Sequence, residues 1–439
     1  MDAWGATEIA EVLEIEFALG YGSGSVALDI RSGGGLRLLE PELSSSVEEP
    51  AKLVRRALDQ PIDSPPLREL ARGRRSAAIL IPGRTRIAGV SDYVPELIDE
   101  LRVAGVPDDG ISIYLATGTH EHHGERDLAE LVGEAVTQQL QCRFHSCQEP
   151  GGLTLLGTTS RGSPVSIDTR VLQAEVKILT GRIVPHYFAG FSGGRKALIP
   201  GVAGFDTILA NHRLTLAPEQ GIHSEVGPCS LAENPVHLDM LEAAAMAAPD
   251  FCLNTLLDTR GRMLAAFAGH WERAHEAGCR ETGRRFQLEV DEPVDLLVTS
   301  SGGLPHDVNF MQSLKAVLNL KSIVRPGGRI LWIAEAAGGM HPGFLDWGAI
   351  QDDAELDRAV RANYSLTGHN SIMLRRLIRS ARVSLKSELP ADQVRRLGIE
   401  VVDSTQGALD EICRELPPDF RVAVAPNANV ICAVLKGAK

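Results

Sequence analysis

The chain has 439 residues, of which 44% are hydrophobic and 23% charged, an ordinary globular composition for two or three domains. The formal net charge of −13 argues against a nucleic-acid-binding surface. No stretch approaches the roughly 20 apolar residues that cross a bilayer. We therefore expect neither nucleic acid nor a membrane as a partner.

The N-terminus is acidic and has no basic region ahead of an apolar run, so we interpret it as mature sequence and not as a signal peptide. The seven cysteines are irregularly scattered, which is typical of reduced thiols in the cytoplasm. Cys142, His145 and Cys147 lie close together. No second ligand pair follows at zinc-site spacing, which disfavours a metal site there.

The first part of the chain alternates between strand and helix patterns. Residues 12–30 form two alternating runs around a Gly-Ser turn, which predicts a β-hairpin, and helix formers at 46–59 precede a proline-rich break. Beyond the break, the pattern predicts strands at 77–82, 111–118 and 176–181 and helices at 92–105, 126–141, 205–217 and 236–248. This rhythm predicts a mostly parallel sheet covered by helices.

A polar stretch near 280–293 indicates a domain boundary, so we expect one domain over 1–285. A second α/β domain is expected over 286–420. A terminal strand-like segment follows over 421–439, and its sequence is compatible with pairing in either domain. The predicted elements of this second part are strands at 294–300, 329–336 and 421–435, helices at 307–324, 352–363 and 370–381, and a turn at RPGG. The expected fold is α/β, with two domains that each have a mostly parallel or mixed sheet flanked by helices and an active site in the cleft between them.

The sequence ATGTH (116–120) stands where a predicted strand ends. Ligands of open α/β sheets bind beyond the carboxyl ends of the strands, so His120 is expected to project into the ligand crevice. The alternative is a solvated loop with chance histidines. We assign His122 and His123 to the surface.

The segment GRIVPHYFAGFSGGRKALIPG (181–201) also follows a predicted strand. Its glycines, among them Gly193 and Gly194, allow the backbone to approach an anion, and an Arg-Lys pair ending at Lys196 adds positive charge. A phosphate site is one interpretation, although the run lacks the ending of a Walker A loop. The alternative is a structural turn with a solvated Arg-Lys pair. The glycine density and His186 favour a functional role.

Two further candidates are weaker on the residues alone. Gln312 and Lys315 are three apart on the helix predicted at 307–324, so they share a face and are suited to clamp a carboxylate. A solvated helix face explains them equally well. His212 lies on or beside a helix, where a lone histidine is more often structural than a ligand.

Together these segments resemble the nickel-pincer-nucleotide-dependent lactate racemase family of 2-hydroxyacid racemases and epimerases. The resemblance covers nearly the whole chain in the same order. Its strongest part is PHYFAGFSGGRK followed by PG and ANH, supported by ATGTH, by the Thr85-Arg86 pair and by GGLPHD with its downstream Gln and Lys.

The resemblance implies a cytoplasmic isomerase that acts on a small 2-hydroxy acid. It implies a cofactor that is held covalently on Lys196. This cofactor is the pyridinium-3-thioamide-5-thiocarboxylic acid mononucleotide with nickel, and cofactor-building enzymes supply it. His212 would be the protein's nickel ligand, and the turn at Gly193 and Gly194 would lie beside the nucleotide in the N-terminal domain. A neutral imidazole is a sensible ligand for square-planar nickel.

The resemblance also implies that His120 and His186 are the catalytic pair. Racemisation by hydride removal at C2 needs one acid/base for each enantiomer, and histidine suits the task because its pKa lies near working pH. Arg86, Gln312 and Lys315 would bind the carboxylate or the C2 oxygen of the substrate.

This chain departs from the family pattern at several places. The family's D-x-T-R-P run is Gly83-Arg84-Thr85-Arg86-Ile87 here, so Arg84 competes with Arg86 for the substrate. Met311 replaces a common aromatic residue, and His369 stands in a region where no substrate-contacting Trp aligns. These differences are more similar to branches of the family that do not act on lactate, so lactate is not expected to be the best substrate.

Three alternatives remain. One is the same cofactor acting on malate or a sugar acid. Another is a phosphate- or nucleotide-binding transferase that uses the glycine-rich turn at 190–196 without nickel. The third is a cofactor carrier without turnover, which the joint presence of His120, His186, Lys196 and His212 disfavours.

Overall fold

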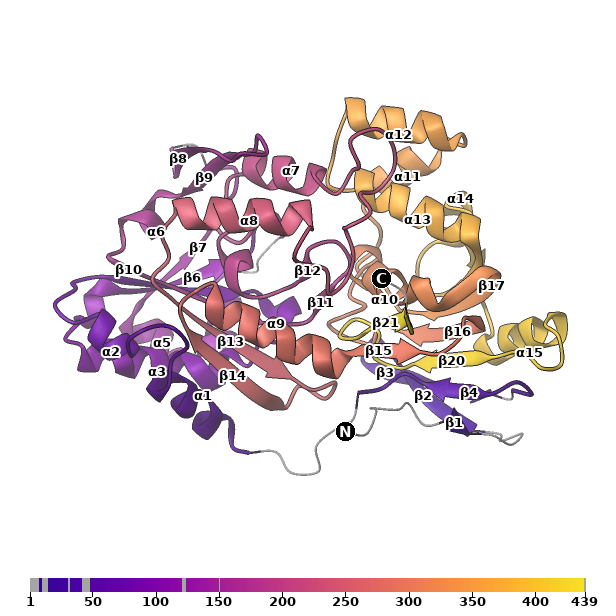
Figure 1. Cartoon of the computed structure of the whole chain (residues 1–439), viewed down its shortest axis with the longest axis horizontal. Helices are drawn as coiled ribbons and strands as arrows, with labels where there is room; N and C mark the ends of the chain where they lie inside the picture. The colour runs from indigo at the N-terminus through magenta and orange to yellow at the C-terminus, as the bar shows by residue number, and fades with distance from the viewer. Residues whose placement is uncertain are drawn as a thin grey trace.

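The computed structural model describes residues 8–9, 15–30, 32–41, 48–120, 124–149 and 151–437. Two α/β halves lie side by side, each built around one large sheet with helices on its faces (Figure 1). The expected α/β class is confirmed. None of the described helices has the length and apolarity needed to cross a lipid bilayer.

The first half contains a six-stranded sheet in the order β14-β13-β10-β5-β6-β7. Its strands are β5 (Ala77–Pro82), β6 (Ile111–Ala116), β7 (Gln141–Phe144), β10 (Val176–Arg182), β13 (Phe251–Leu257) and β14 (Met263–Gly269). All neighbours are parallel except β13 and β14. Every residue of β10 and β13 is buried, as expected for central strands of a sheet that is covered on both faces.

Four helices of this half match predicted ranges: α1 (Pro50–Asp59), α3 (Val90–Val103), α7 (Phe205–Arg213) and α8 (Pro235–Met246). Three were not predicted: α2 (Leu67–Leu70), α6 (Thr169–Gln173) and α9 (Arg273–Phe286), the last of which overlaps the polar stretch near 280–293. The remaining two are α4 (Glu125–Val132) and α5 (Glu134–Gln139). The single helix predicted at 126–141 is wrong, because Gly133 at φ +88° separates α4 from α5.

The second half contains a seven-stranded sheet in the order β1-β4-β20-β16-β17-β18-β19. Its strands are β1 (Glu8–Ile9), β4 (Leu36–Leu38), β16 (Val294–Ser300), β17 (Val324–Ile333), β18 (Ala381–Lys386), β19 (Glu400–Val401) and β20 (Val422–Ala425). The predicted βαβ unit is present as β16, α10 (Phe310–Leu320) and β17. The RPGG sequence lies inside β17 and not in a turn.

Five further helices belong to the second half: α11 (Gly343–Gly348), α12 (Asp353–Ala362), α13 (Gly368–Ser380), α14 (Ala391–Arg396) and α15 (Thr405–Glu415). The run predicted as one strand at 421–435 splits into two. β20 joins the second sheet, and β21 (Cys432–Leu435) pairs with β15 (Gln287–Val290), which follows α9. The two strands thus belong to different sheets.

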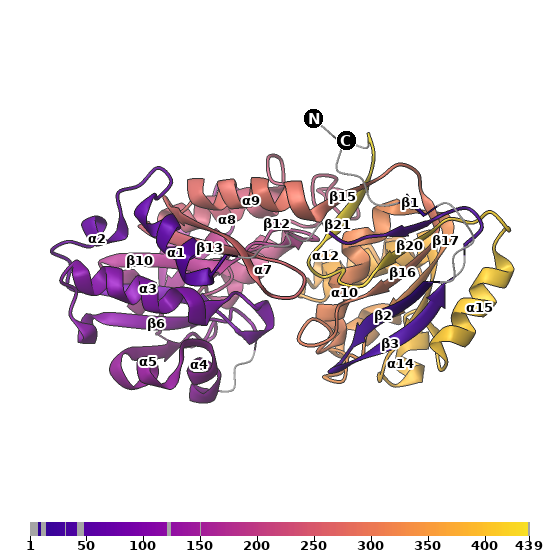
Figure 2. The ribbon, with the colours of Figure 1, turned by 90° about the horizontal axis from the view of Figure 1, so that it is seen from below.

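The predicted hairpin is present as β2 (Ile15–Tyr21) and β3 (Gly24–Ile30), and it lies beside the second half (Figure 2). Gly20 packs so closely on this half that a Cβ there would lie 2.5 Å from the Gly302 carbonyl carbon. Together with β1 and β4, this places N-terminal strands on the second half, whereas we expected all of 1–285 in the first domain. The division at 285/286 itself stays a prediction.

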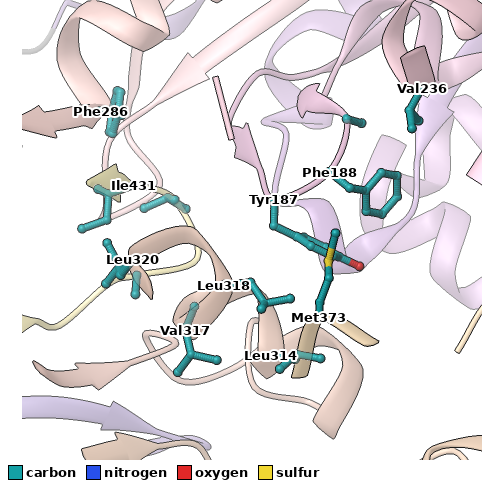
Figure 3. Packing of buried hydrophobic residues seen from close by; sticks show 14 of the residues in the cluster. Tyr187, Phe188, Val236, Phe286, Leu314, Val317, Leu318, Leu320, Met373 and Ile431 are labelled. Carbon is teal, nitrogen blue, oxygen red and sulfur yellow. The ribbon is translucent and has the colours of Figure 1, made fainter. Parts of the chain in front are cut away.

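The small strands form the remaining two-stranded sheets: β8 (Leu153–Thr158) with β9 (Pro164–Asp168), and β11 (Pro185–His186) with β12 (Gly190–Phe191). The largest hydrophobic cluster runs through both halves. Where they meet, Tyr187 and Phe188 of the first half face Leu314 and Met373 of the second (Figure 3). This apolar contact fixes the surroundings of the candidate site.

Candidate active site

Three loops of the first half meet because of the strand order of its sheet. The order reverses at β5, which has β6 on one side and β10 on the other. The loops that follow these parallel strands therefore emerge at one edge, the usual ligand position in open α/β sheets. They carry Arg86, His120 and the segment from Ile183 to Lys196.

Arg86 and His120 contact each other across two of these loops. The Arg86 Nη2 atom lies 3.3 Å from His120 Nε2. Arg84, by contrast, points to α4, where its Nη2 atom lies 3.0 Å from a carboxylate oxygen of Glu130. Of the two arginines, Arg86 is the one beside a candidate catalytic residue.

His186 and Lys196 are brought together by the β11–β12 turn and the 3₁₀ helix that follows it. Lys196 Nζ lies 3.5 Å from His186 Nε2 and 5.2 Å from the centre of the Phe188 ring. Burial, followed by the charges of Arg195 and Arg86, holds the pKa of Lys196 well below its usual value. A neutral amine is the nucleophilic form of lysine.

The glycines before Lys196 occupy space that a side chain would not fit. Gly193 and Gly194 have φ angles of +75° and +51°. A Cβ on Gly193 would lie 2.8 Å from Asn254 Oδ1, and a Cβ on Gly194 would lie 2.6 Å from the His275 ring. The Gly194 N–H donates to Asn254 Oδ1 at 2.8 Å, so this donor is already used inside the protein.

The Arg195 side chain also makes its contacts inside the protein. This side chain is fully buried, and it donates to the Ala189 carbonyl and contacts His275 Nε2 at 3.0 Å. It therefore anchors the turn beneath Lys196. This overturns the expectation that an Arg-Lys pair offers two cations to a phosphate at this turn.

His212 lies on α7, on the other side of Phe188. The two ring centres are 5.0 Å apart. Its Nδ1 atom is buried and has no hydrogen-bond partner among the described residues, which leaves Nε2 for a ligand. Burial, then His369 and Lys196, holds the pKa of His212 well below its usual value. A neutral imidazole is the form that binds a metal.

Gln312 and Lys315 come from the second half, on α10. The Asn309 side chain caps this helix by accepting the Gln312 N–H. Lys315 Nζ donates to Gln312 Oε1, which confirms that the two share a face. Burial, then Arg86 and Lys196, holds the pKa of Lys315 well below its usual value, so α10 presents this amine to the loops of the first half.

Tyr187 and Asn370 at this junction were missed by sequence reasoning, whereas His369 was noted without an assigned role. Tyr187 donates to Asn370 Oδ1 at 2.7 Å, joining the β11–β12 turn to α13. His369, one residue earlier, packs edge-on against Phe188 with ring centres 5.3 Å apart. The aromatic pair in PHYFAG was a usable signal. Its partners on α13 were not predictable, because they meet it only in the tertiary structure.

The candidate site is rich in cations. Partial desolvation and then Arg86, Lys315 and Lys196 lower the pKa of His120 to about 3, although part of its ring stays open to solvent. Burial and then Lys196, Lys315 and Arg86 hold the pKa of His186 well below its usual value. The charges acting on both histidines are positive. Such a site is built for an anionic ligand.

Other expected features lie elsewhere. His122 and His123 fall outside the described residues. His145 contacts Asp168 Oδ2 and the Ala203 carbonyl, so both of its ring nitrogens are used. Within the part of the chain that the structure describes, no group of three or more His, Cys, Asp or Glu side chains is placed to hold a metal ion.

The fold and the site define a two-domain α/β protein with a cluster of basic and imidazole side chains where its halves meet. The family profile of the lactate racemase N-terminal domain matches residues 21–223. The lactate racemase of Thermoanaerobacterium thermosaccharolyticum is 33% identical over 331 residues, 74% of this chain and 76% of the relative. The chain belongs to the lactate racemase family and is an isomerase of the racemase type.

Two further comparisons agree with this assignment. The lactate racemase of Lactiplantibacillus plantarum is 28% identical over 85% of this chain and 88% of its own length. The lactate racemase apoprotein structure from T. thermosaccharolyticum superposes with a TM-score of 0.85 at 27% identity, covering 95% of this chain and 100% of that one. A Thermotoga maritima protein with a TM-score of 0.66 and 16% identity, covering 90% and 100%, shares the fold.

Proposed function

We propose that the protein racemises or epimerises a small 2-hydroxy acid by hydride transfer between substrate C2 and a nickel-pincer nucleotide tethered to Lys196. The observation that carries this proposal is the contact of Lys196 with His186 in a site whose other charged groups, Arg86 and Lys315, are also cations. Membership of the lactate racemase family supplies the reaction class.

The residues present fit the implied cofactor. Lys196 is a half-buried amine whose pKa is held well below its usual value, which favours the nucleophilic form needed for a covalent amide-type bond. The glycine turn leaves backbone where a side chain would obstruct, and His212 offers a neutral imidazole whose other nitrogen is buried. Once bound, the cofactor would supply reversible hydride uptake, which no side chain provides.

His120 and His186 are proposed as the two acid/base residues. The Arg86 guanidinium donates toward His120 Nε2, and desolvation followed by nearby positive charges lowers the pKa of both histidines, which favours the neutral imidazole. A neutral imidazole accepts the hydroxyl proton of the substrate as hydride leaves C2, and the imidazolium returns it. The substrate carboxylate offsets the neighbouring cations and raises both pKa values toward the working range.

Arg86, Gln312 and Lys315 are proposed to bind the substrate. Arg86 belongs to the first half and the other two to the second, so an anion held by all three would draw the halves together. A guanidinium suits a carboxylate, and the Lys315–Gln312 pair offers N–H donors to a second oxygen. Lactate, malate and sugar acids all present this carboxylate-hydroxyl unit.

The nucleotide-binding transferase is the weaker candidate. It requires free donors in the glycine-rich turn, but the Gly194 N–H is bonded to Asn254 Oδ1 and Arg195 is fully buried. The cytoplasmic location and the need for separate cofactor-building enzymes stay predictions.

The decisive experiment is intact-protein mass spectrometry with nickel analysis on protein co-produced with cofactor-building enzymes. We expect an added mass that maps to Lys196 and about one nickel per chain. Racemisation would then be followed with a panel of enantiopure 2-hydroxy acids. An unmodified, nickel-free chain from a system that loads a known lactate racemase would overturn the proposal.

A further inference from the structure

Tyr364 and His369 form a buried pair in the second half. The Tyr364 hydroxyl lies 2.7 Å from His369 Nδ1, and the two rings stack with centres 6.0 Å apart. The His369 side chain is only 1% exposed. Its other nitrogen, Nε2, has no hydrogen-bond partner within the described ranges. A buried polar atom without a hydrogen bond is unfavourable, so a partner is expected for it.

His212, from the first half, also has a ring nitrogen without a hydrogen-bond partner in the part of the chain that the structure describes. Its Nδ1 atom is also buried and unpartnered, and its ring centre lies 6.2 Å from that of His369. Two imidazoles joined by a hydrogen bond of about 2.9 Å have centres roughly 5 Å apart. The two ring centres are therefore about 1 Å too far apart for a direct hydrogen bond. Phe188 packs edge-on against both histidine rings.

A histidine that binds a metal through one nitrogen usually donates the N–H of the other nitrogen to a fixed acceptor. That bond selects the tautomer whose lone pair faces the metal. The Ile208 carbonyl, one helical turn before His212, acts as a backbone hydrogen-bond partner that raises the pKa of the ring against the larger lowering effect of burial, but Nδ1 makes no hydrogen bond of normal length and angle with the described residues. Helix α7 itself therefore supplies only a poorly placed acceptor.

We propose that His369 is a positioning residue for His212. The Nδ1–H of His212 donates to His369 Nε2, and the Nδ1–H of His369 donates to the Tyr364 hydroxyl oxygen. This relay leaves the lone pair of His212 Nε2 free for the metal. The inference rests on the proposed role of His212, and it adds that the ligand is oriented by the opposite half of the protein.

The first test uses the full chain without cofactor, so it does not depend on loading. Long-range ¹H–¹⁵N NMR of ¹⁵N-histidine protein reports which ring nitrogen carries the proton. We expect both His212 and His369 to be protonated on Nδ1, and His369→Phe to give a mixture of His212 tautomers. An Nε2-protonated His212 in the unsubstituted chain, or an unchanged tautomer in His369→Phe, would overturn the relay.

The second test measures nickel release to a chelator from loaded protein, with the mass on Lys196 as an internal check. We expect His369→Phe to bind nickel roughly 10–100-fold more weakly while keeping the tethered mass. His369→Gln, which keeps a side-chain acceptor, should retain most of the affinity, and Tyr364→Phe should lie between. His237→Phe is the matched control, since His237 is another buried histidine with an unpartnered Nδ1, on α8.

Equal nickel retention in His369→Phe and the unsubstituted chain would overturn the positioning role. If the unsubstituted chain carried neither mass nor nickel, the proposed function would fail instead. The NMR result would still decide the relay in that case.

Discussion

Lys196 Nζ lies 3.5 Å from His186 Nε2, with the face of Phe188 5.2 Å from the same amine. The proposed attachment point and one proposed acid/base are therefore in contact before anything binds. Both belong to one continuous segment, which runs from β11 through β12 into the 3₁₀ helix Gly194–Ala197. A group attached to this amine would thus be held directly beside a proton-transfer residue.

Lys196→Ala should lose the tethered mass and all racemase activity, because the substitution removes the only proposed point of attachment. Lys315→Ala is the informative control, since it removes the other lysine near His186. This variant should keep the mass and lose substrate affinity. Peptide mapping after co-production with cofactor-building enzymes measures both. An adduct that persisted in Lys196→Ala would show that the cofactor is attached to another residue.

His120→Ala and His186→Ala should each abolish racemisation while the cofactor stays attached. Each histidine serves one enantiomer, but a full cycle needs both. Loss of a general acid/base typically costs about 10²–10⁴-fold. Chiral chromatography from each pure enantiomer measures the rates, and His341→Ala, at an exposed position, should match the unsubstituted chain. Robust turnover by either single variant would rule out the two-base scheme.

Arg86→Ala should raise KM for the substrate by roughly 10–100-fold, the usual consequence of losing a charge-assisted bond to a carboxylate. Arg84→Ala should change KM little, because Arg84 pairs with Glu130 on α4. Steady-state kinetics on both variants separates the two arginines that the sequence left in competition. A larger effect in Arg84→Ala would reverse the assignment.

Gly194→Ala should destabilise the protein by about 1–3 kcal/mol and reduce cofactor loading. The residue has φ +51°, and the new Cβ would lie 2.6 Å from the His275 ring. Gly227→Ala is the matched control, since nothing lies within 4 Å of its Cβ position. Urea unfolding compares the two free energies of unfolding. Equal stability would show that the turn tolerates a side chain.

Lys315→Met should raise the pKa of His120 above about 3, toward the ordinary histidine value near 6.5. The Lys315 charge disfavours the imidazolium, so its removal makes protonation easier. Histidine ¹H–¹³C NMR titration of the full chain reads this directly. Lys321→Met, a substitution on the same half of the protein, should leave His120 unchanged. A lower pKa in Lys315→Met would contradict the cationic nature of the site.

The local sequence determined the elements whose pattern repeats over several residues. Buried parallel strands such as Ala77–Pro82 and Val176–Arg182 contain short apolar runs, and they were predicted closely. The end of the strand predicted at 111–118 located His120, and the end of Val176–Arg182 located the 181–201 segment. Strand β13 was missed, although it is buried throughout, because a short apolar run does not by itself distinguish strand from helix.

The pairing of strands that lie far apart in the chain could not be predicted from the sequence. The strands β1 and β4 join the sheet formed by residues after 294, because hydrogen-bond partners in a sheet are chosen by packing across the whole chain. The run at 421–435 looked like one strand, yet its two ends pair with different sheets.

For the site, the sequence by itself determined which residue types are available and which loops carry them. Only the tertiary structure decided that Arg86 faces His120 whereas Arg84 turns to Glu130, that Arg195 is buried as an anchor, and that His369 meets His212. The physical reason is that burial and charge act through space. A side chain's partners, and with them its protonation state, depend on which distant elements pack against it.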